Sequence, residues 1–556
     1  MSKNIKFSNL NRKKTVAKMA KETYDLVVIG GGITGGGIAL DAASRGLKVA
    51  LVEKGDFASG TSSKSTKLIH GGLRYLKQFD FWLVKEVGSE RAIVHKLAPH
   101  LVLPEKMLLP LIENGSYGKW LTSIGLKVYD ILAQVTGDDK RKMLEKKEAM
   151  KLEPLLPKKI VKGAGYYAEY RTDDARLTIE NIKTSLQFGA QALNYAAVTD
   201  FVYEEDTIAG VVVKDGVSGE SLTIKSNYVV SAAGPWVDEL RVVNNSKKGK
   251  RLHLTKGVHL VFPYEKLPLK HSTYFDVPDG RMMFAIPRGK VTYVGTSDTN
   301  YNDNKDKVTT DLADAIYIIS AVNNMFPKIE LELDDVISSW AGLRPLIHEE
   351  GKSASELSRK DEIFTSETGL ISIAGGKLTG YRKMAERIVD RIAKKMEEVG
   401  GKKLKECTTD AIPLCGNTDF KKFKHVTKYI DAIFERIKAD GFTEYDAWFL
   451  VTNYGKQTET ILETYAALKD EDPYVRLIKA ELRFGIDYEM VQNPMDFFIR
   501  RTGRLYFDID SIRNHLESIL EEFKTIYKTD DAQLLAWKET LQNEMAEHSD
   551  FSLERV

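Results

Sequence analysis

The first strong pattern of apolar and polar positions lies in residues 24–53. An apolar run, 24–29, leads into a glycine-rich turn. A helical stretch with its apolar residues on one face follows, and a second short apolar run ends at Glu53. A strand, a turn, a helix and a second strand in this order predict the first unit of a parallel sheet.

The later parts of the chain have different periodicities. Residues 163–240 combine a helical stretch with short β-branched runs, whereas residues 241–345 contain repeated short strands separated by turn residues. A mainly antiparallel sheet is the expected product of the second pattern. Residues 346–400 return to a strand, a glycine pair and an amphipathic helix, and residues 401–556 are rich in charge and helical periodicity.

Composition narrows the classes of protein without selecting one. The 556 residues are enough for two to four domains at about 150 residues per domain. Lysine plus arginine (81) nearly balance aspartate plus glutamate (79), which gives no sign of a nucleic-acid partner. Cys407 and Cys415 form neither a disulfide framework nor a metal quartet, and we expect both to be thiols in a reducing compartment.

Membrane and targeting signals are weak. No apolar run approaches about eighteen residues, so we expect no segment to span a bilayer. Residues 1–22 are basic and lack an apolar core, which excludes a secretory signal. We expect these residues to form a flexible basic leader, with an electrostatic membrane contact as the alternative.

Glycines and one acid give residues 24–53 their candidate chemistry. In the turn GGGITG, Gly30, Gly32 and Gly35 would supply the tight turn, the close approach of backbone to a pyrophosphate, and the close packing of helix on strand. Glu53 is placed to accept hydrogen bonds from a ribose 2′-hydroxyl, which argues against a 2′-phosphate. These residues predict a dinucleotide site but do not separate NAD from FAD.

A second glycine turn decides between the two cofactors. The strand 370–374 is followed by Gly375-Gly376 and by a helix from Thr379 onward. Its N-terminus, with Lys377 beside it, would stabilise the negative charge that develops on a reduced flavin. A nicotinamide enzyme has no need of this late return to the same sheet, whereas extended FAD does. We therefore predict FAD.

A hydroxyl-rich loop follows Glu53, and residues 60–76 read GTSSKSTKLIHGGLRYL. Its small donors to a phosphate chain or ring system include Thr61, Ser62 and Ser63. His70 can gain or lose a proton near neutral pH, and Arg74 can pair with a carboxylate or phosphate. Taken alone, the same residues fit a polar surface loop followed by a helix whose His and Arg are solvated equally well.

The combined motifs resemble those of the FAD-dependent glycerol-3-phosphate dehydrogenases, a family of peripheral membrane flavoenzymes. The string SSKSTKLIHGGLRYL after GGGITGGGIALDAASRG carries the resemblance most specifically. Further family motifs follow in the family's order: TDDARL at 172–177, AGPW at 233–236, KGVH at 256–259, GTSD at 295–298, AGLRPL at 341–346 and GGKLTGYRK at 375–383. The family commonly has GTTD and GGKLTTYR at two of these places, so we assign no catalytic role to Gly380.

The motifs and the resemblance together imply roles for particular residues. The expected cofactor-binding residues are Gly30, Gly32, Gly35, Glu53, Thr61, Ser62, Ser63, Gly234, Gly375, Gly376, Lys377 and Leu378. The expected substrate-binding residues are Arg74, Tyr75, Arg344, Lys377 and Thr379, and the expected catalytic residues are His70, His259 and Arg344. Either histidine could be the base or a proton relay. Without the resemblance, His259 would read equally well as a core histidine and Arg344 as a solvated charge.

The resemblance implies a flavoenzyme that oxidises sn-glycerol 3-phosphate to dihydroxyacetone phosphate by hydride transfer to FAD and passes the electrons to membrane quinone. Three alternatives stay open. One is a glycerol-3-phosphate oxidase that uses oxygen, although those enzymes usually carry a sizeable insertion that is not seen here. The others are an amino-acid or amine oxidase whose arginine binds a carboxylate, and a non-redox FAD-binding scaffold.

The expected fold class is α/β: a two-dinucleotide-binding-type FAD domain with a mainly antiparallel β-sheet substrate domain and a C-terminal helical domain. The FAD domain is expected in three parts, at residues 20–68, 163–240 and 346–400. Between them we expect a substrate or cap region with a possible membrane contact at 69–162 and the antiparallel-sheet substrate domain at 241–345. The C-terminal helical domain is expected at 401–556. An amphipathic stretch at 118–132 would suit a membrane contact or packing on the protein itself. The resemblance implies a cytoplasmic enzyme, peripheral on the inner face of the cell membrane, and leaves a homodimer open.

Overall fold

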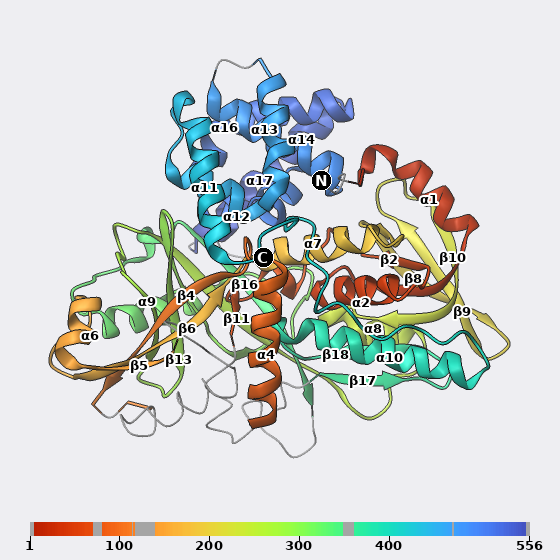
Figure 1. Ribbon diagram of the computed structural model, residues 1–556, viewed down its shortest axis with the longest axis horizontal. Coiled ribbons are helices and arrows are strands. Elements are labelled where there is room, and N and C mark those ends of the chain that lie inside the picture. Colours follow the sequence, from red (N-terminus) through yellow and green to blue (C-terminus); the bar gives the residue numbers. More distant parts are fainter. Residues whose placement is uncertain are drawn as a thin grey trace.

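The computed structural model describes residues 5–70, 81–113, 115–116, 140–348, 361–469 and 472–551. Three predictions, Arg74, Tyr75 and the amphipathic stretch at 118–132, lie outside the described residues. The described part contains two sheets side by side with a group of C-terminal helices, coloured blue, above them (Figure 1).

The first sheet is parallel at its centre. Its strands run in the order β17-β18-β10-β1-β2-β7, with β9 beside β10 and β8 beside β9. The strands that form parallel pairs are β1 (Thr23–Ile29), β2 (Val49–Val52), β7 (Gln191–Leu193), β10 (Ser221–Ser231) and β18 (Ile371–Ala374). The strands with only antiparallel partners are β8 (Ala196–Glu204), β9 (Thr207–Asp215) and β17 (Glu362–Thr365). The strands β1 and β2 are almost wholly buried, as expected for parallel strands covered on both faces.

Three helices pack together against the first sheet. The helix α2 (Ile33–Ser44) follows the glycine turn and contacts both α7 (Asp174–Leu186) and α10 (Tyr381–Glu398). The apolar stripe of α10, which includes Ile388 and Ile392, is buried in the same core as β1 and β2. A short helix, α8 (Val237–Val243), follows β10. The order strand, turn, helix, strand predicted for residues 24–53 is therefore confirmed.

The second sheet is mainly antiparallel, as predicted. Its strands run in the order β15-β11-β14-β13-β12-β4-β6-β3, with β16 beside β11 and β5 beside β6. Their bounds are β3 (Leu68–Ile69), β4 (Leu103–Ile112), β5 (Lys142–Glu145), β6 (Val161–Arg171), β11 (Arg251–Pro263), β12 (Ser272–Asp276), β13 (Met282–Arg288), β14 (Val291–Gly295), β15 (Thr299–Asn300) and β16 (Ser338–His348). The helices beside these strands along the chain are α4 (Phe81–Leu97), α6 (Lys146–Leu152) and α9 (Leu312–Met325).

One predicted boundary between the two sheets needs correction. Residues 163–171 were expected in the FAD domain, but they belong to β6 and pair with β4 in the second sheet. A β-rich run shows only that a strand forms. Its partner is set by the long antiparallel register between Leu103–Ile112 and this strand, which local sequence does not reveal.

The C-terminal residues are helical, as predicted, and pack on the second sheet. Their bounds are α11 (Phe423–Ile437), α12 (Glu444–Tyr454), α13 (Thr458–Ala467), α14 (Pro473–Tyr488), the π-helix η10 (Asp496–Arg501), α15 (Arg504–Phe507), α16 (Ile509–Tyr527) and α17 (Asp531–Ser549). One core lies among α11 to α14, and a second joins α14 to α17 to Trp340 of β16 and Val261 of β11. This second core fixes the helices over the substrate sheet.

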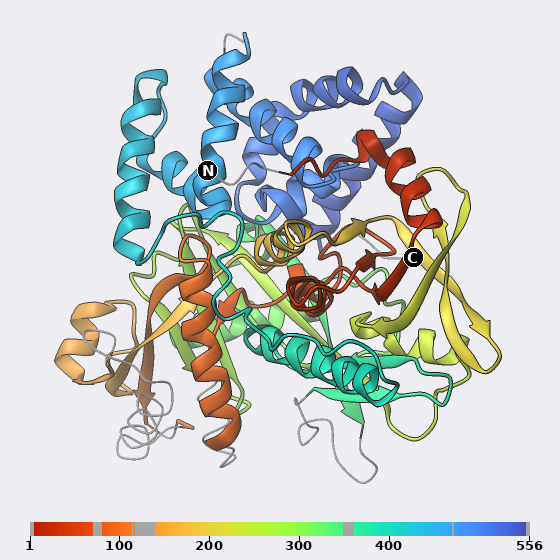
Figure 2. The same cartoon turned by 45° about the vertical axis from the view of Figure 1, so that its right-hand side comes forward.

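The expectation of a flexible basic leader is wrong for the described residues 5–21. Residues 12–21 form α1 (Arg12–Lys21), which lies beside β10 (Figures 1 and 2). The buried guanidinium of Arg12 pairs with Asp215 at 2.8 Å, and Met19 is buried in the core of the first sheet. Asp215 and much of the core around Met19 are distant in sequence from α1, so the charge content of residues 1–22 could not predict these contacts.

Candidate active site

A cavity of about 350 Å³ lies at the carboxyl ends of β1, β2, β10 and β18. Ligands of open α/β sheets bind at this edge. Most of the predicted cofactor residues line the cavity: Gly30, Gly32, Glu53, Thr61, Ser62, Gly234, Gly375, Gly376, Lys377 and Leu378. Gly35 and Ser63 do not line it. Residues from three separate stretches of the chain therefore meet around one space.

The glycines of the first turn are required by close backbone contacts. Gly30 has a φ of +113°, and a Cβ on it would lie 2.5 Å from the carbonyl oxygen of Ala232. A Cβ on Gly35 would overlap the carbonyl oxygen of Gly30. Gly35 therefore allows α2 to approach β1 and acts through packing, which explains why it does not line the cavity.

Glu53 lies at the end of β2 and lines the cavity. Its carboxylate accepts hydrogen bonds from the backbone N–H groups of Gly31 (2.6 Å) and Gly55 (2.9 Å). Burial raises the pKa of this carboxyl, while the two backbone donors act in the opposite direction. Each carboxylate oxygen has more than one lone pair, so Glu53 can still accept from a ribose hydroxyl.

The hydroxyl-rich loop is held against both sheets. The Thr61 hydroxyl donates to the carbonyl of Leu343 in β16 at 2.8 Å. The Ser62 hydroxyl accepts from the N–H of Ile33 at the start of α2 at 2.9 Å, and so keeps its own hydrogen for a second partner. Ser63 is buried, and its hydroxyl donates to the carbonyl of Gly60 within the same loop at 3.4 Å. The cavity therefore presents a hydroxyl donor beside a helix N-terminus.

The late glycine turn closes the other end of the cavity. Gly375 and Gly376 both have a φ of +78°, and Lys377 precedes the short 3₁₀ helix η7 (Leu378–Gly380). Thr379 is buried, and its hydroxyl accepts from the N–H of His70 (3.2 Å) and can donate to the carbonyl of the same residue (3.3 Å). This contact joins the predicted flavin-end turn to the candidate base.

The shape and donors of the cavity fit FAD. Because β2 and β18 lie on opposite sides of β1 and β10, Glu53 and the turn 375–378 stand at opposite ends of the cavity, with the N-terminus of α2 and Ser62 between them. An extended dinucleotide needs an acceptor for the ribose, backbone donors for the pyrophosphate and a positive end for the flavin ring. A Cβ at Gly30 or Gly35 would remove the close approach that this arrangement requires.

The two candidate histidines have different surroundings. His70 is partly exposed, and its ring packs edge-on against Phe284 of β13 at 5.8 Å between centroids. His259 of β11 is 1% exposed, and its ring stacks on Trp340 at 4.8 Å. The Nε2 atom of His259 lies 2.9 Å from the hydroxyl oxygen of Thr66. Neither histidine lines the cavity, and His259 contacts the hydroxyl-rich loop.

The pKa of His259 is lowered well below its usual value. Burial is the largest cause, and the Arg344 and Lys67 cations add to it. A buried ring beside two cations strongly favours the neutral form. His259 is therefore neutral at neutral pH.

Arg344 lies in β16 immediately before Pro345, which lines the cavity. Its guanidinium donates to the Thr296 hydroxyl (2.8 Å), the Ser297 carbonyl (3.1 Å) and the Asp298 carboxylate (3.2 Å). Gly257 leaves the space for this guanidinium, because a Cβ there would overlap it. The side chain keeps 24% of its exposure, so the structure holds Arg344 in position without burying it.

Some features of the site were not predicted. Trp236 and Val198 line the cavity, and the Lys54 ammonium lies 4.2 Å from the centroid of the Trp236 ring. The AGPW motif was a signal for Trp236, whereas nothing local marked Val198. Lys67 was also missed as a possible site residue, although it stands within the hydroxyl-rich loop. It is completely buried.

The described residues contain neither a candidate metal site nor a candidate membrane-spanning helix. In that part of the chain no group of three or more His, Cys, Asp or Glu side chains could hold a metal ion. None of its helices is long and apolar enough to cross a membrane.

Comparisons with known proteins agree with this geometry. Residues 25–382 match the family model described as FAD dependent oxidoreductase. Residues 407–534 match the model described as the C-terminal domain of alpha-glycerophosphate oxidase. Together the two models cover nearly all of both sheets, nearly all of the residues that line the cavity and most of the C-terminal helices.

Individual relatives are similar over nearly the whole chain. The aerobic glycerol-3-phosphate dehydrogenase of Bacillus subtilis (strain 168) is 49% identical over 95% of this chain and 96% of its own. The enzyme of the same name from Staphylococcus haemolyticus (strain JCSC1435) is 46% identical over 99% of this chain and 98% of its own. The solved structure of the glycerol-3-phosphate dehydrogenase from Bacillus halodurans, complexed with FAD, has a TM-score of 0.84 and 41% identity, and covers 99% of this chain and 100% of that one.

Proposed function

This chain belongs to the family of FAD-dependent oxidoreductases, among the glycerol-3-phosphate dehydrogenases, and we propose that it oxidises glycerol 3-phosphate at the cavity described above. The product is dihydroxyacetone phosphate. The observation that carries this proposal is the convergence of Glu53, Ser62 and Lys377 on one cavity whose flavin end adjoins Arg344 and His70.

FAD, when bound, supplies the hydride acceptor. The chain's own residues bind and orient the substrate and move its hydroxyl proton. We assign the phosphate to Arg344 and Lys377, with Arg74 and Thr379 as further candidates, because a dianion needs several charge-assisted donors. Tyr75 is a further candidate at the substrate side.

His70 is the stronger candidate for the base. It is partly exposed, and it is tied through Thr379 to the turn that lines the flavin end. His259 is buried against Trp340 with its Nε2 atom on the Thr66 hydroxyl, so it suits a relay or a supporting role. A neutral imidazole within hydrogen-bond reach of the hydroxyl would accept its proton near pH 7.

For the electron acceptor we propose membrane quinone, reached through a peripheral membrane contact. The support is the name shared by relatives that are 46–49% identical, which are dehydrogenases and not oxidases. A cytoplasmic enzyme on the inner face of the cell membrane, as a monomer or a homodimer, is the arrangement that follows from this acceptor.

Anaerobic bleaching of the flavin tests the reaction. Glycerol 3-phosphate should bleach the yellow holoenzyme under argon, whereas glycerol, glycine and D-alanine should not. Glycerol is the matched control because it lacks only the phosphate that Arg344 and Lys377 would bind. Bleaching by an amino acid alone would contradict the proposal.

A second assay separates the acceptors. With glycerol 3-phosphate present, a soluble quinone should be reduced in stoichiometric amounts, and oxygen should yield little hydrogen peroxide. Stoichiometric peroxide without quinone reduction would assign the chain to the oxidases. Sedimentation with anionic vesicles, and not with neutral ones, would support the membrane contact.

A further inference from the structure

Lys67 is a completely buried lysine between the predicted cofactor residues and His70. Its side chain is 1% exposed. The Nζ atom donates to the carbonyl of Ser63 at 3.0 Å and to the Asp174 carboxylate at 2.5 Å. A buried ammonium is costly unless it is paired and hydrogen-bonded, so these contacts hold Lys67 in one place.

Three aromatic rings surround the same ammonium. The Nζ atom lies 5.6 Å from the ring centroid of Trp340, 5.7 Å from that of Tyr506 and 5.9 Å from that of Phe507. Trp340 belongs to β16 of the substrate sheet, whereas Tyr506 and Phe507 belong to α15 of the C-terminal helices. Cations are attracted to aromatic ring faces at such distances. Two distant parts of the chain therefore complete the surroundings of Lys67.

The backbone beside Lys67 is fixed at successive positions. The Asp174 carboxylate accepts from the N–H (3.0 Å) and the hydroxyl (2.6 Å) of Ser65. The carbonyls of Ser65 and Thr66 accept from the side chains of Trp340 and Tyr293, each at 3.1 Å. Lys67 itself has a φ of +56°, which a non-glycine residue adopts only where its surroundings determine it.

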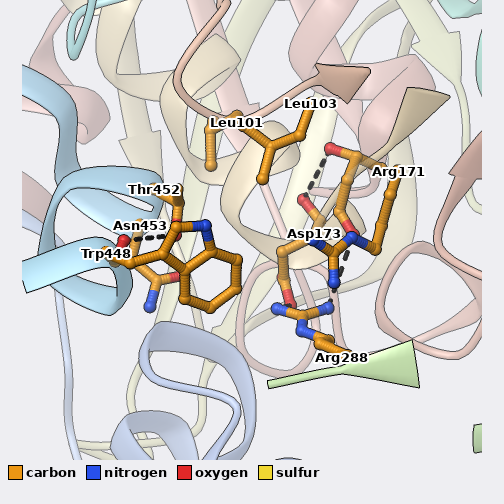
Figure 3. Close-up of a pocket in the computed structure, with 9 residues that line it drawn as sticks. Leu101, Leu103, Arg171, Asp173, Arg288, Trp448, Thr452 and Asn453 are labelled. Atoms are coloured by element: carbon orange, nitrogen blue, oxygen red, sulfur yellow. Dashed lines mark hydrogen bonds and ion pairs between the residues drawn. The ribbon is translucent and has the colours of Figure 1, made fainter. Parts of the chain in front are cut away.

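A second carboxylate, that of Asp173, lies near the Lys67 ammonium. Asp173 lies 3.9 Å from the Lys67 ammonium and accepts from Arg288 at 3.3 Å. Figure 3 shows the Asp173 carboxylate next to the Arg288 guanidinium, with Arg171 on one side and Trp448 of α12 on the other. The pocket there has a volume of about 10 Å³, enough for about one water molecule. Lys67 and Arg288 thus share Asp173 as an anionic partner, and the Asp173 side chain is 9% exposed.

We propose that Lys67 is a positioning residue of the redox site, through which the C-terminal helices set the geometry of residues 61–70. Lys67 ties Ser63, beside the cofactor-binding hydroxyls, to Asp174 at the start of α7. The following residues lead directly to His70. The inference rests on the proposed function, because it assumes that this loop holds FAD and presents the base.

The test compares variants of the full-length holoenzyme. Lys67→Met/Asp174→Asn removes both members of the pair, so that no unpaired charge stays buried. We expect at least a roughly ten-fold weaker FAD affinity, because residues 61–70 lose the charged hydrogen bonds that fix them. We also expect an altered flavin absorption spectrum and a shifted pH profile of anaerobic reduction. Reconstitution of the apoprotein, followed by flavin fluorescence, measures the affinity.

Lys183→Met is the matched control. Lys183 is also a buried lysine, and it lies in α7. Its ammonium donates to Gln457 (2.6 Å) and Glu489 (2.9 Å), and the residue does not line the cavity. Glu489 keeps a bidentate pair with Arg176 in this variant. The FAD affinity should stay within about three-fold of the value for the parent protein, even if the melting temperature falls. The flavin absorption spectrum should be unchanged. An equal loss of FAD affinity in both variants would overturn the proposal.

A milder variant covers the case in which the double variant does not fold. Phe507→Leu removes one ring from the C-terminal side without changing any charge, and should alter the flavin spectrum and the pH profile in the same direction. Unchanged spectrum, affinity and pH profile in either folded Lys67-site variant would overturn the proposal. FAD affinity and spectrum need no substrate, so a failure here is distinguishable from a failure of glycerol 3-phosphate to bleach the flavin.

Discussion

The two ends of the cavity are built in different ways. At the Glu53 end, a single stretch of thirty residues supplies the turn, the helix N-terminus and the acid, and the turn and the helix N-terminus offer backbone N–H groups. Near the other end, the candidate residues Arg344 and His70 come from separate parts of the chain, and both would act through their side chains. The first end should therefore be most sensitive to added atoms, and the second to removed functional groups.

The largest effect is expected at the backbone-built end. Gly35→Ala would place a Cβ against the carbonyl of Gly30 and force α2 away from β1. Overpacking of this kind costs about 1–3 kcal/mol or more, and here it also deforms the pyrophosphate site. We expect the variant to purify without FAD, as measured by absorbance and by thermal melting.

Gly380→Ala is the control for this substitution. Gly380 has a φ of −90°, and no atom lies within 4 Å of a Cβ built on it. The Gly380→Ala protein should retain its flavin. If Gly35→Ala also purified with a full complement of FAD, the contact with Gly30 would not limit the site.

The next effect concerns the two histidines. His70→Gln should slow anaerobic flavin reduction by glycerol 3-phosphate about 10²–10⁴-fold, as expected for the loss of a general base. His259→Gln should have a smaller effect because its ring faces Thr66. Stopped-flow absorbance measures both rates. If His259→Gln lost more of the reduction rate than His70→Gln, His259 would be the base and His70 the supporting residue.

A smaller effect is expected for Arg344, the arginine proposed to bind the substrate phosphate. Arg344→Met should raise KM for glycerol 3-phosphate and lower kcat/KM about 10- to 100-fold, because a charge-assisted hydrogen bond is worth about 1.5–3 kcal/mol. Arg281→Met is the control, since Arg281 is a more exposed arginine that pairs with Asp279. A change in kcat alone, with KM unaltered, would argue against binding of the substrate by Arg344.

The smallest effect is on stability. The native pKa of His259 is lowered, so below the unfolded-state pKa of about 6.5 the unfolded chain binds a proton that the native protein does not. Stability from this residue is present above pH 6.5 and is lost as the pH falls below it, by up to about 1.4 kcal/mol per pH unit. His259→Gln should flatten this slope in urea titrations between pH 7 and 5.5. Identical slopes would show that His259 stays neutral in both states or charged in both.

The sequence predicted the cofactor end better than the substrate end. Gly30, Gly32 and Glu53 were located from local pattern, and the structure places all three around the cavity. FAD and the family were also predicted, and the comparisons confirm both. The residues expected to bind the substrate phosphate and to act as the base were assigned from the family resemblance, and their roles stay predictions. Arg74 and Tyr75 lie outside the described residues.

Other features could not be predicted because they depend on distant partners. The residues 163–171 were expected in the wrong sheet, and Arg12 was expected in a flexible leader although it is buried against Asp215. Lys67 gave no local sign of burial among three rings from β16 and α15. Charge and β-propensity are properties of a residue, whereas burial and pairing are properties of the packed chain.

By itself, the sequence determined the glycine turns, the periodicity of their helices and strands, and thereby the class of cofactor, because these depend on backbone geometry within short stretches. Only the tertiary structure decided which side chains meet at the flavin end. It also decided that His259 is neutral and buried, and that C-terminal rings enclose Lys67, because these follow from desolvation and from contacts between residues hundreds of positions apart.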